Sequence, residues 1–208
     1  MGPRFYKGYY DVVILLPPAV RDEAIRLSRA VKRRTPASFV LGRRKFIPHI
    51  SLYHVPIAAR DFPTFRQVLE RIISQSRLGT LAVQEIASRG GSSLWLGVTN
   101  PAWLKRLHRQ VLNEIALLRN RRFNASRTWG GGYSERRREL IQRYGAPSVG
   151  RFFRPHITIT SLRDDRDAPR VLKALRVRPQ SFGVTSISVC ELGSHHTCHR
   201  IVFTIRKP

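Results

Sequence analysis

Hydrophobic positions along the chain fall into short blocks with two different spacings. Apolar residues recur every three or four positions, the spacing of an amphipathic helix, in residues 19–33, 61–76, 100–119 and 167–175. Runs that are apolar throughout, or that alternate with polar residues, predict strands over 9–16, 48–53, 81–87, 93–99, 153–162, 182–192 and 197–206. The last two strands are expected to form a hairpin across Gly193 and Ser194, and Ser134 can cap a short helix over 134–144.

The order of these predicted elements repeats. It reads strand, helix, His-bearing strand, helix, strand, and a similar order starts again at Ser93. His49 lies 39 positions after Tyr10, whereas His156 lies 62 positions after Leu94. The 23 extra residues of the second interval fall within 120–151, which we therefore interpret as an insertion.

The repeat predicts a fold class and a division of the chain. We expect an α+β fold, two-lobed and duplicated, with antiparallel sheets flanked by helices and a central cleft. The chain of 208 residues has the length of one such domain, with lobe one at about 8–90 and lobe two at about 91–208. An ordinary alternation of helices and strands without duplication is the alternative.

Positive charge is the first indication of a partner. The chain has 38 Lys and Arg against 13 Asp and Glu, a net charge of +25, and 32 of the basic residues are Arg. Guanidinium groups bind phosphate through paired donors, so this excess favours a phosphate-rich partner, although Arg can also serve solubility alone. Ten Arg and two Glu lie between Arg119 and Arg154. The insertion is therefore a candidate lid or RNA-contacting arm, and a mobile loop is the compatible alternative, with its glycine-rich stretch 129–133 flexible.

Membrane and disulfide classes are not favoured. No stretch approaches the roughly 18 consecutive apolar residues that a membrane span needs. The chain has two cysteines, Cys190 and Cys198, which is too few for a disulfide framework, so we expect a cytoplasmic protein. His195, His196 and His199 stand beside them, but the spacing matches no common zinc site. We weigh a metal site and a disulfide here, and predict a plain hairpin with no metal.

Two strands carry the same short motif. One reads Pro-His49-Ile-Ser51-Leu, and the other reads Pro-His156-Ile-Thr158-Ile. Residues two apart in a strand point to the same face, so each His shares a face with its hydroxyl residue while the apolar residues face a core. Composition alone gives an expectation of roughly 0.01 copies of this pattern. Two core histidines, each bonded to a neighbouring hydroxyl, are the structural alternative to a functional pair.

Further candidates follow from strand alternation. Arg154 lies two residues before His156, on its face, and is a candidate phosphate clamp. Tyr53 is placed on the face of His49 and Ser51, as a base-stacking residue or a rim aromatic, and Thr160 on the face of His156. His54 lies an odd number of positions from His49 and is expected to face away, in a structural role. His108 is expected on the surface or in packing, and no carboxylate cluster is expected near these strands.

The paired motifs resemble those of the 2H phosphoesterase superfamily, the LigT-like or 2′–5′ RNA ligase proteins. These carry two His-x-Ser/Thr motifs, one in each lobe of a duplicated α+β fold, and the resemblance extends from the strand at Tyr10 to the final hairpin. It implies that His49 and His156 act as general acid and base, and that Ser51 and Thr158 bond phosphate oxygens. Family members often have an aromatic residue five after the first His and Arg five after the second, where this chain has His54 and Ser161.

The resemblance and the chemistry imply the same activity. Opening a cyclic phosphodiester requires one proton removed from water and one delivered to the leaving oxygen, which two imidazoles can do. We expect a metal-independent phosphodiesterase, without cofactor, that hydrolyses or reversibly forms 2′,3′-cyclic phosphate or 2′–5′ linkages of RNA ends or small nucleotides. RNA or nucleotides are the expected partners of a monomer. A non-catalytic RNA- or nucleotide-binding protein and a hydrolase of signalling cyclic nucleotides are the alternatives.

Overall fold

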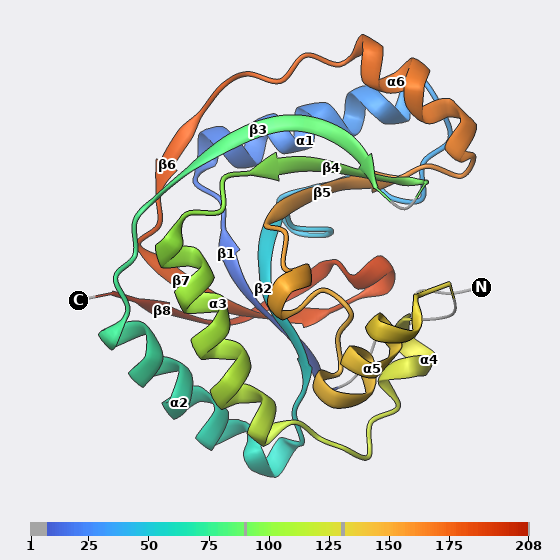
Figure 1. Ribbon diagram of the computed structural model, residues 1–208. Helices are drawn as coiled ribbons and strands as arrows, with labels where there is room; N and C mark the ends of the chain where they lie inside the picture. Colours follow the sequence, from blue (N-terminus) through green and yellow to red (C-terminus); the bar gives the residue numbers. More distant parts are fainter. Residues whose placement is uncertain (1–7, 90, 130–131, 208) are drawn as a thin grey trace.

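A computed structural model of the protein describes residues 8–89, 91–129 and 132–207 (Figure 1). Part of the glycine-rich stretch expected to be flexible, Gly130 and Gly131, lies outside these ranges. The strands are β1 (Tyr9–Leu15), β2 (His49–Pro56), β3 (Thr80–Arg89), β4 (Ser93–Val98), β5 (His156–Ser161), β6 (Ser181–Gly183), β7 (Ser186–Leu192) and β8 (Cys198–Arg206). The helices are α1 (Pro18–Lys32), α2 (Phe62–Gln75), α3 (Ala102–Ile115), α4 (Ala125–Trp129), α5 (Glu135–Tyr144) and α6 (Ala168–Ala174).

These elements agree with the hydrophobic pattern, with ends displaced by a few residues. The main difference lies in the predicted strand 182–192, which is divided into β6 and β7. β6 pairs with β3, whereas β7 pairs with β1 and β8. Apolar residues recur through 182–192 because both strands contribute buried side chains, although the two strands lie toward opposite ends of the strand order.

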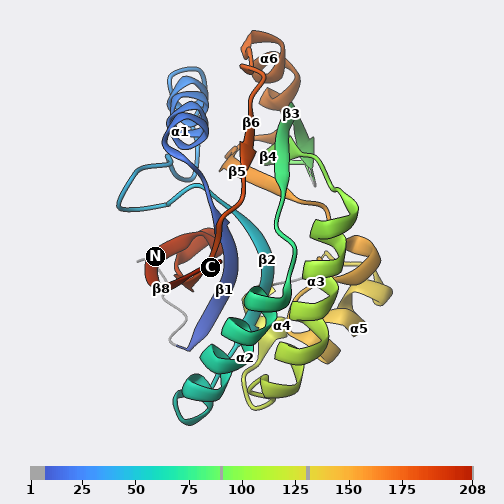
Figure 2. The same ribbon diagram turned by 90° about the vertical axis from the view of Figure 1, so that its left-hand side faces the viewer.

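The strands of the described chain form one antiparallel sheet in the order β6-β3-β4-β5-β2-β1-β7-β8. Reading outward from the centre, β2-β1-β7-β8 (the β2 half) mirrors β5-β4-β3-β6 (the β5 half). Helices α2 and α3 pack on the β2 half, and α1 and α6 pack on the β5 half (Figures 1 and 2). The expected division near residue 90 follows the chain, whereas in space β3 joins the β5 half and β7 and β8 join the β2 half.

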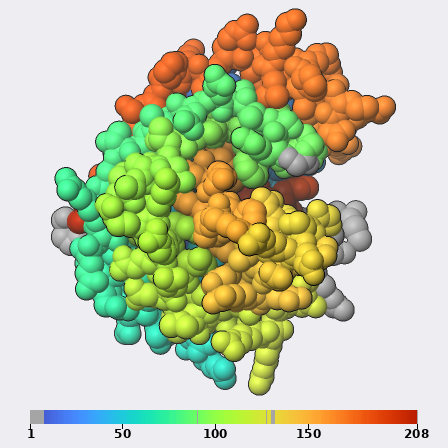
Figure 3. Space-filling model, viewed as in Figure 1, coloured from blue at the N-terminus to red at the C-terminus, as the bar shows by residue number. Residues whose placement is uncertain are grey.

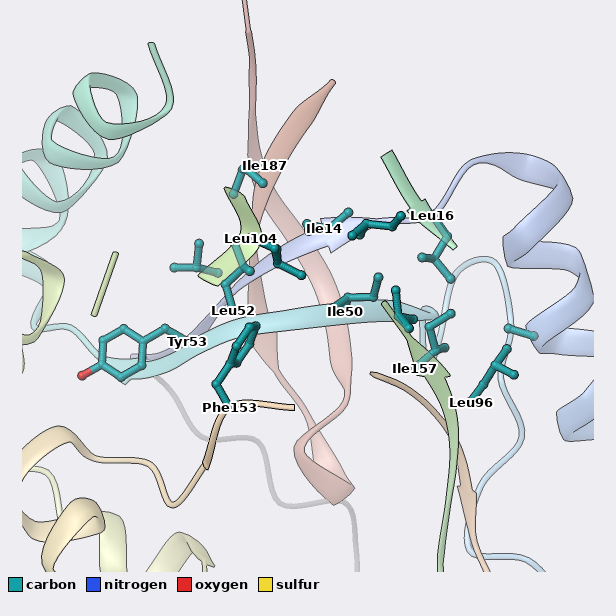
Figure 4. Packing of buried hydrophobic residues seen from close by; sticks show 14 of the residues in the cluster. Ile14, Leu16, Ile50, Leu52, Tyr53, Leu96, Leu104, Phe153, Ile157 and Ile187 are labelled. Carbon is teal, nitrogen blue, oxygen red and sulfur yellow. The ribbon is translucent and has the colours of Figure 1, made fainter. Parts of the chain in front are cut away.

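A continuous hydrophobic core lies between the sheet and these helices. Its centre is formed by the apolar residues of the two motif strands, with Ile50, Leu52 and Ile157 pointing to the same side (Figure 4). All three side chains are buried. Burial of this face fixes the register of β2 and β5, because a slip by one residue would turn His49 and His156 into the core.

The inserted segment folds into α4 and α5, which pack on each other. Gly145, which has a positive φ of 83°, ends α5. The Gly145 carbonyl accepts hydrogen bonds from the Tyr9 hydroxyl and from Nε1 of Trp129, both at 2.8 Å. The insertion is therefore anchored to β1. None of the helices in the described ranges has the length and apolar character that a membrane crossing requires.

Candidate active site

The two motif strands are neighbours at the centre of the sheet. Ile50 of β2 is paired with Ile157 of β5. Because the strands are antiparallel, this pair sets His49 across from Thr158 and Ser51 across from His156. The two histidines are then diagonal neighbours, and such positions lie about 7–8 Å apart in a regular pair of strands. The fold therefore brings together all four motif residues, as the sequence predicts.

These residues line an open cleft of about 1720 Å³. Figure 3 shows a hollow between the β3–β4 hairpin and the α4–α5 segment, with the β7–β8 hairpin at its floor. The described residues that line the cleft include four arginines and one carboxylate: Arg89, Arg137, Arg154, Arg176 and Glu85. A cleft with this balance of charge attracts anions.

Both histidine rings are held by the main chain in the same way. Nδ1 of His49 bonds the carbonyl of Ile47 at 2.7 Å, and Nδ1 of His156 bonds the carbonyl of Arg154 at 2.7 Å. A carbonyl can only accept, so Nδ1 carries a proton in each ring. Nε2 is consequently the nitrogen of each ring that can accept or donate a proton in chemistry.

A β-bulge follows each motif. In β2, Ser51 pairs with Val13 and Tyr53 with Val12, so Leu52 is the extra residue. The same irregularity occurs in β5, where Thr158 pairs with Trp95 and Thr160 with Leu94, so Ile159 is extra. An extra residue reverses which face the following side chains occupy.

The bulges correct three expectations that assumed regular alternation. His54 does not face away, but lines the cleft beside Ser51. Tyr53 does not share the face of His49: its side chain is 2% exposed and its hydroxyl donates to the Tyr144 carbonyl, although it borders the cleft. Thr160 is fully buried and donates to the Phe39 carbonyl, while Ser161 lines the cleft instead.

His108 has the packing role that was one of its two expected roles. Its Nδ1 donates to the carbonyl of Leu52, the bulge residue, and its Nε2 accepts from the backbone N–H of Gly150. The ring stacks on Phe153, with centroids 3.9 Å apart. Burial lowers the pKa of His108 to about 4, so the ring is neutral and satisfies the carbonyl that the bulge removes from the strand ladder.

Asp11 of β1 is the site residue that the sequence analysis missed. Its carboxylate is fully buried, and Oδ2 accepts a 2.6 Å hydrogen bond from the Ser51 hydroxyl. Nε2 of His54 lies 2.9 Å from the same oxygen, and Nε2 of His49 lies 3.3 Å from it. The sequence predicted no carboxylate cluster near the motif strands, and this single buried carboxylate was not anticipated. A single acidic residue in the otherwise apolar run 9–16 was the available signal, because a buried carboxylate needs partners.

The charge of Asp11 has opposite consequences for the two motif histidines. Burial acts to lower the pKa of His49, but the hydrogen bond and charge of Asp11 outweigh it and raise that pKa. Burial acts to raise the pKa of Asp11, but the positive charges and hydrogen bonds of His54 and His49 lower it. For His156, burial dominates and lowers the pKa to about 4. At neutral pH, His156 is therefore neutral and His49 has the greater tendency to carry a proton.

The β5 half surrounds its histidine differently. Trp95 stacks on the ring of His156, with centroids 3.5 Å apart and an interplanar angle of 12°. At the position that Asp11 and His54 occupy in the β2 half, β4 and β5 pair Ser93 with Ser161. Their hydroxyl oxygens lie 3.3 Å apart. The duplicated positions thus hold a charged pair in one half and a neutral pair in the other.

Arg154, the candidate phosphate clamp, is one of the residues that line the cleft, and its side chain is exposed. In the structure its guanidinium donates to the carbonyls of Arg151 and Phe153, at 3.0 and 3.1 Å. Its own carbonyl holds His156. Arg154 therefore contributes to the site through its backbone, and its charged group is close enough to the cleft to meet an anion.

The β7–β8 hairpin differs from the plain hairpin that we predicted. Cys190 and Cys198 form a disulfide, and both residues are fully buried behind β1 and the loop before β2. A bulge in the ladder aligns them, since Glu191 pairs with Arg200 but Leu192 pairs with Cys198. Within the described residues, no group of His, Cys, Asp or Glu has the arrangement of a metal site.

The turn of this hairpin brings two more histidines to the cleft. His195 and His196 have positive φ angles of 60° and 55° and line the cleft. His196 stacks on Trp129 of α4, with centroids 4.1 Å apart, and Trp129 also contacts His54 at 5.2 Å between centroids. The insertion therefore forms part of the wall of the site.

Comparisons with known proteins agree with this geometry. The family model described as the 2′-5′ RNA ligase superfamily matches residues 16–195. No curated protein matches the chain. Among solved structures, TT0787 of Thermus thermophilus is 15% identical, with a TM-score of 0.62 over 95% of this chain and 97% of that one. E. coli LigT complexed with 3′-AMP is 18% identical, with a TM-score of 0.56 over 99% of each chain. This chain belongs to the 2′-5′ RNA ligase superfamily, the 2H phosphoesterases that its two histidine motifs resemble.

Proposed function

We propose that the protein is a metal-independent phosphodiesterase that hydrolyses, or reversibly forms, 2′,3′-cyclic phosphate or 2′–5′ linkages of RNA ends or small nucleotides. The observation that carries this proposal is the pair of imidazoles on adjacent strands, His49 and His156. Each has Nδ1 fixed by a carbonyl, and both line one arginine-rich cleft. Two such groups on a phosphodiester can supply the proton donor and the proton acceptor that its opening requires.

The surroundings of each ring support a division of labour. His156, neutral because its pKa is lowered to about 4, acts as the base that takes a proton from water. His49, whose pKa is raised beside Asp11, acts as the acid: its Nε2, which lies 3.3 Å from Oδ2 of Asp11, passes its proton to the leaving oxygen rather than to the carboxylate. In the direction of ligation the two roles are exchanged, since each step is reversible.

The motif hydroxyls are proposed to contribute unequally. The Ser51 hydroxyl donates to Asp11, so its proton is directed away from a bound phosphate. Among the described residues, no carboxylate holds the Thr158 hydroxyl in the way that Asp11 holds that of Ser51. Thr158 is therefore the hydroxyl that donates to a non-bridging phosphate oxygen as negative charge develops. Arg154, with the other arginines of the cleft, attracts the polyanion.

RNA or a nucleotide is the proposed partner, and a similar structure, that of E. coli LigT, is complexed with 3′-AMP. We propose that the protein acts as a monomer in the cytoplasm. In a reducing cytoplasm we expect the Cys190–Cys198 disulfide to be open, because disulfides are rare in cytosolic proteins outside hyperthermophiles, and an oxidised pair would contradict this location. Mass spectrometry of the protein from its own cells, after rapid thiol alkylation, measures whether the pair is oxidised there.

A substrate panel tests the proposed activity. RNA ending in a 2′,3′-cyclic phosphate, a 2′–5′-linked dinucleotide and a cyclic dinucleotide are each incubated with the wild type, H49A and H156A, in the presence of EDTA. We expect EDTA-resistant turnover of one of the first two substrates by the wild type and by H199A, a control outside the cleft. Turnover of the cyclic dinucleotide alone would identify a signalling hydrolase. RNA binding without turnover would identify a non-catalytic protein.

A further inference from the structure

The buried carboxylate of Asp11 lies in the β2 half, in contact with a proposed catalytic residue. The proposed function explains two imidazoles and a hydroxyl but not this carboxylate. One oxygen, Oδ2, lies within 3.3 Å of the Ser51 hydroxyl, His54 Nε2 and His49 Nε2. The other oxygen, Oδ1, is buried and has no hydrogen-bond partner in the described part of the chain.

An ionised carboxylate in such a position is costly unless positive charge stands beside it. Transfer of a carboxylate into a protein interior is strongly unfavourable until the carboxylate is paired. Here the neighbours that can carry positive charge are two imidazoles, His49 and His54. The buried carboxylate and a protonated ring therefore stabilise each other, and the proton is retained on the side of the site where Asp11 lies.

Resting on the proposed function, we propose that Asp11 is a positioning residue that keeps His49 protonated, and thereby makes it the proton donor, while His54 competes for the same carboxylate oxygen. The geometry supports both parts. His54 Nε2 is closer to Oδ2 than His49 Nε2 is, 2.9 Å against 3.3 Å. Because both rings share Oδ2, each ring reduces the extent to which Asp11 can stabilise a positive charge on the other.

The structure also identifies the other groups that face Asp11. His49 and His54 come from β2, and His156 from β5 and His196 from the β7–β8 turn lie within electrostatic range of its charge. Cys190 of β7 is the strand partner of Asp11, but it is disulfide-bonded and does not titrate. The pKa values of His156 and His196 are lowered to about 4, so both rings are neutral through the pH range of the test.

The test is the Asp11→Asn variant, which keeps the shape of the side chain and removes its charge. The pKa of His49 is read from the NMR signals of ¹⁵N-labelled histidine, and log(kcat/KM) is measured against pH on the substrate that the panel identifies. We expect the pKa of His49, and with it the basic limb of the pH profile, to fall by about 1–3 units. Above the new pKa, the activity falls by about tenfold per pH unit.

The variant His54→Phe tests the competition, because it removes the second imidazole from the carboxylate and leaves His49 and the Ser51 hydroxyl beside it. We expect the pKa of His49 and the basic limb to move to higher pH, opposite to the effect of Asp11→Asn. Asp22→Asn is the matched control, since it makes the same chemical change at a half-buried carboxylate of α1 that pairs with Arg43, away from the cleft. It should move neither quantity.

The outcomes separate this inference from the proposed function. A basic limb and a His49 pKa that are unchanged in Asp11→Asn, with only the maximal rate reduced, would overturn the positioning role. If no substrate is turned over, the proposed function fails, but the NMR titration still measures whether the pKa of His49 depends on Asp11. If Asp11→Asn does not fold, the His54→Phe titration decides, and an unchanged His49 pKa there rejects the shared carboxylate.

Discussion

The two halves of the sheet use the same backbone for opposite electrostatic purposes. Each contains a histidine held through Nδ1 by the carbonyl two residues earlier, and each has a bulge directly after its motif. The neighbouring strands differ. β1 offers a buried carboxylate to His49, whereas β4 offers the indole of Trp95 to His156.

This difference shows how a duplicated scaffold acquires an acid and a base. The main chain sets the orientation of both rings, and the residue on the adjacent strand sets the charge that each ring prefers. The pKa of His49 is raised by Asp11 in spite of its burial, and the pKa of His156 is lowered by burial. Two groups whose environments separate their pKa values are suited to complementary roles in proton transfer.

Removing either imidazole should have the largest effect on activity. We expect His49→Ala and His156→Ala each to lower kcat by about 10²–10⁴, because each deletes one proton-transfer step. The measurement is turnover of the identified substrate, with circular dichroism to verify folding. Near-normal turnover by a folded variant would remove that histidine from the mechanism.

Removing the hydroxyl of Thr158 should lower the activity more than removing that of Ser51. Thr158→Val is expected to lower kcat by about 10²-fold, the effect of deleting one donor to a developing oxyanion. Ser51→Ala should lower it by less than about tenfold, because that hydroxyl donates to Asp11 rather than to substrate. Steady-state kinetics on both variants measure the ratio, and equal losses would contradict the unequal roles.

The pH dependence of stability should have opposite signs for the two histidines. The folded-state pKa of His156, about 4, lies below its ordinary value, so its contribution to stability is present above pH 6.5 and is lost as the pH falls toward 4. The folded-state pKa of His49 is raised, so its contribution is present below pH 6.5 and is lost as the pH rises through that pKa.

Urea unfolding of glutamine variants measures this difference. Between pH 7 and pH 5, the wild type should lose about 1–2 kcal/mol of unfolding free energy that His156→Gln does not lose. His49→Gln should instead remove a loss that begins as the pH rises above about 6.5. Identical pH profiles for the wild type and both variants would show that the rings titrate alike in the folded and unfolded chain.

The smallest effect is expected at the neutral counterpart of the Asp11–His54 pair. Ser93→Ala and Ser161→Ala each remove a hydroxyl from a contact of 3.3 Å without leaving a buried charge. We expect unfolding free energies within about 1 kcal/mol of the wild type, and pH profiles with unchanged limbs. A limb displaced as far as in Asp11→Asn would mean that this position matters equally in both halves.

Much of the fold could be predicted from the hydrophobic pattern, since burial of one face determines both the elements and their register. The repeat of a strand carrying Pro-His-x-Ser/Thr was also sufficient to locate the four central residues. Strand order was less accessible. The alternating segment 182–192 does not indicate that it forms two strands toward opposite ends of the sheet. That division depends on the pairing of β6 with β3 and of β7 with β1.

The rest of the site depended on features that a strict period of two cannot represent. The bulge residues Leu52 and Ile159 are ordinary apolar residues, so nothing in their identity marks the reversal of faces that follows them. His54 was misassigned for this reason. The chain departs from the family pattern five residues after each motif histidine, at His54 and Ser161. The bulges turn these two positions back into the cleft.

The tether of each imidazole to a backbone carbonyl limits how the site can change. Every amino acid offers the same carbonyl, so exchanging the side chain of Ile47 or Arg154 does not delete the acceptor. Point mutations therefore have little effect on the orientation of the two rings. They can change the proton affinity of a ring when they replace its neighbour on the adjacent strand. Engineered variants with new pH optima are accordingly best sought at residues 11 and 95. A single replacement there changes the proton affinity of one ring and keeps the orientation of both rings.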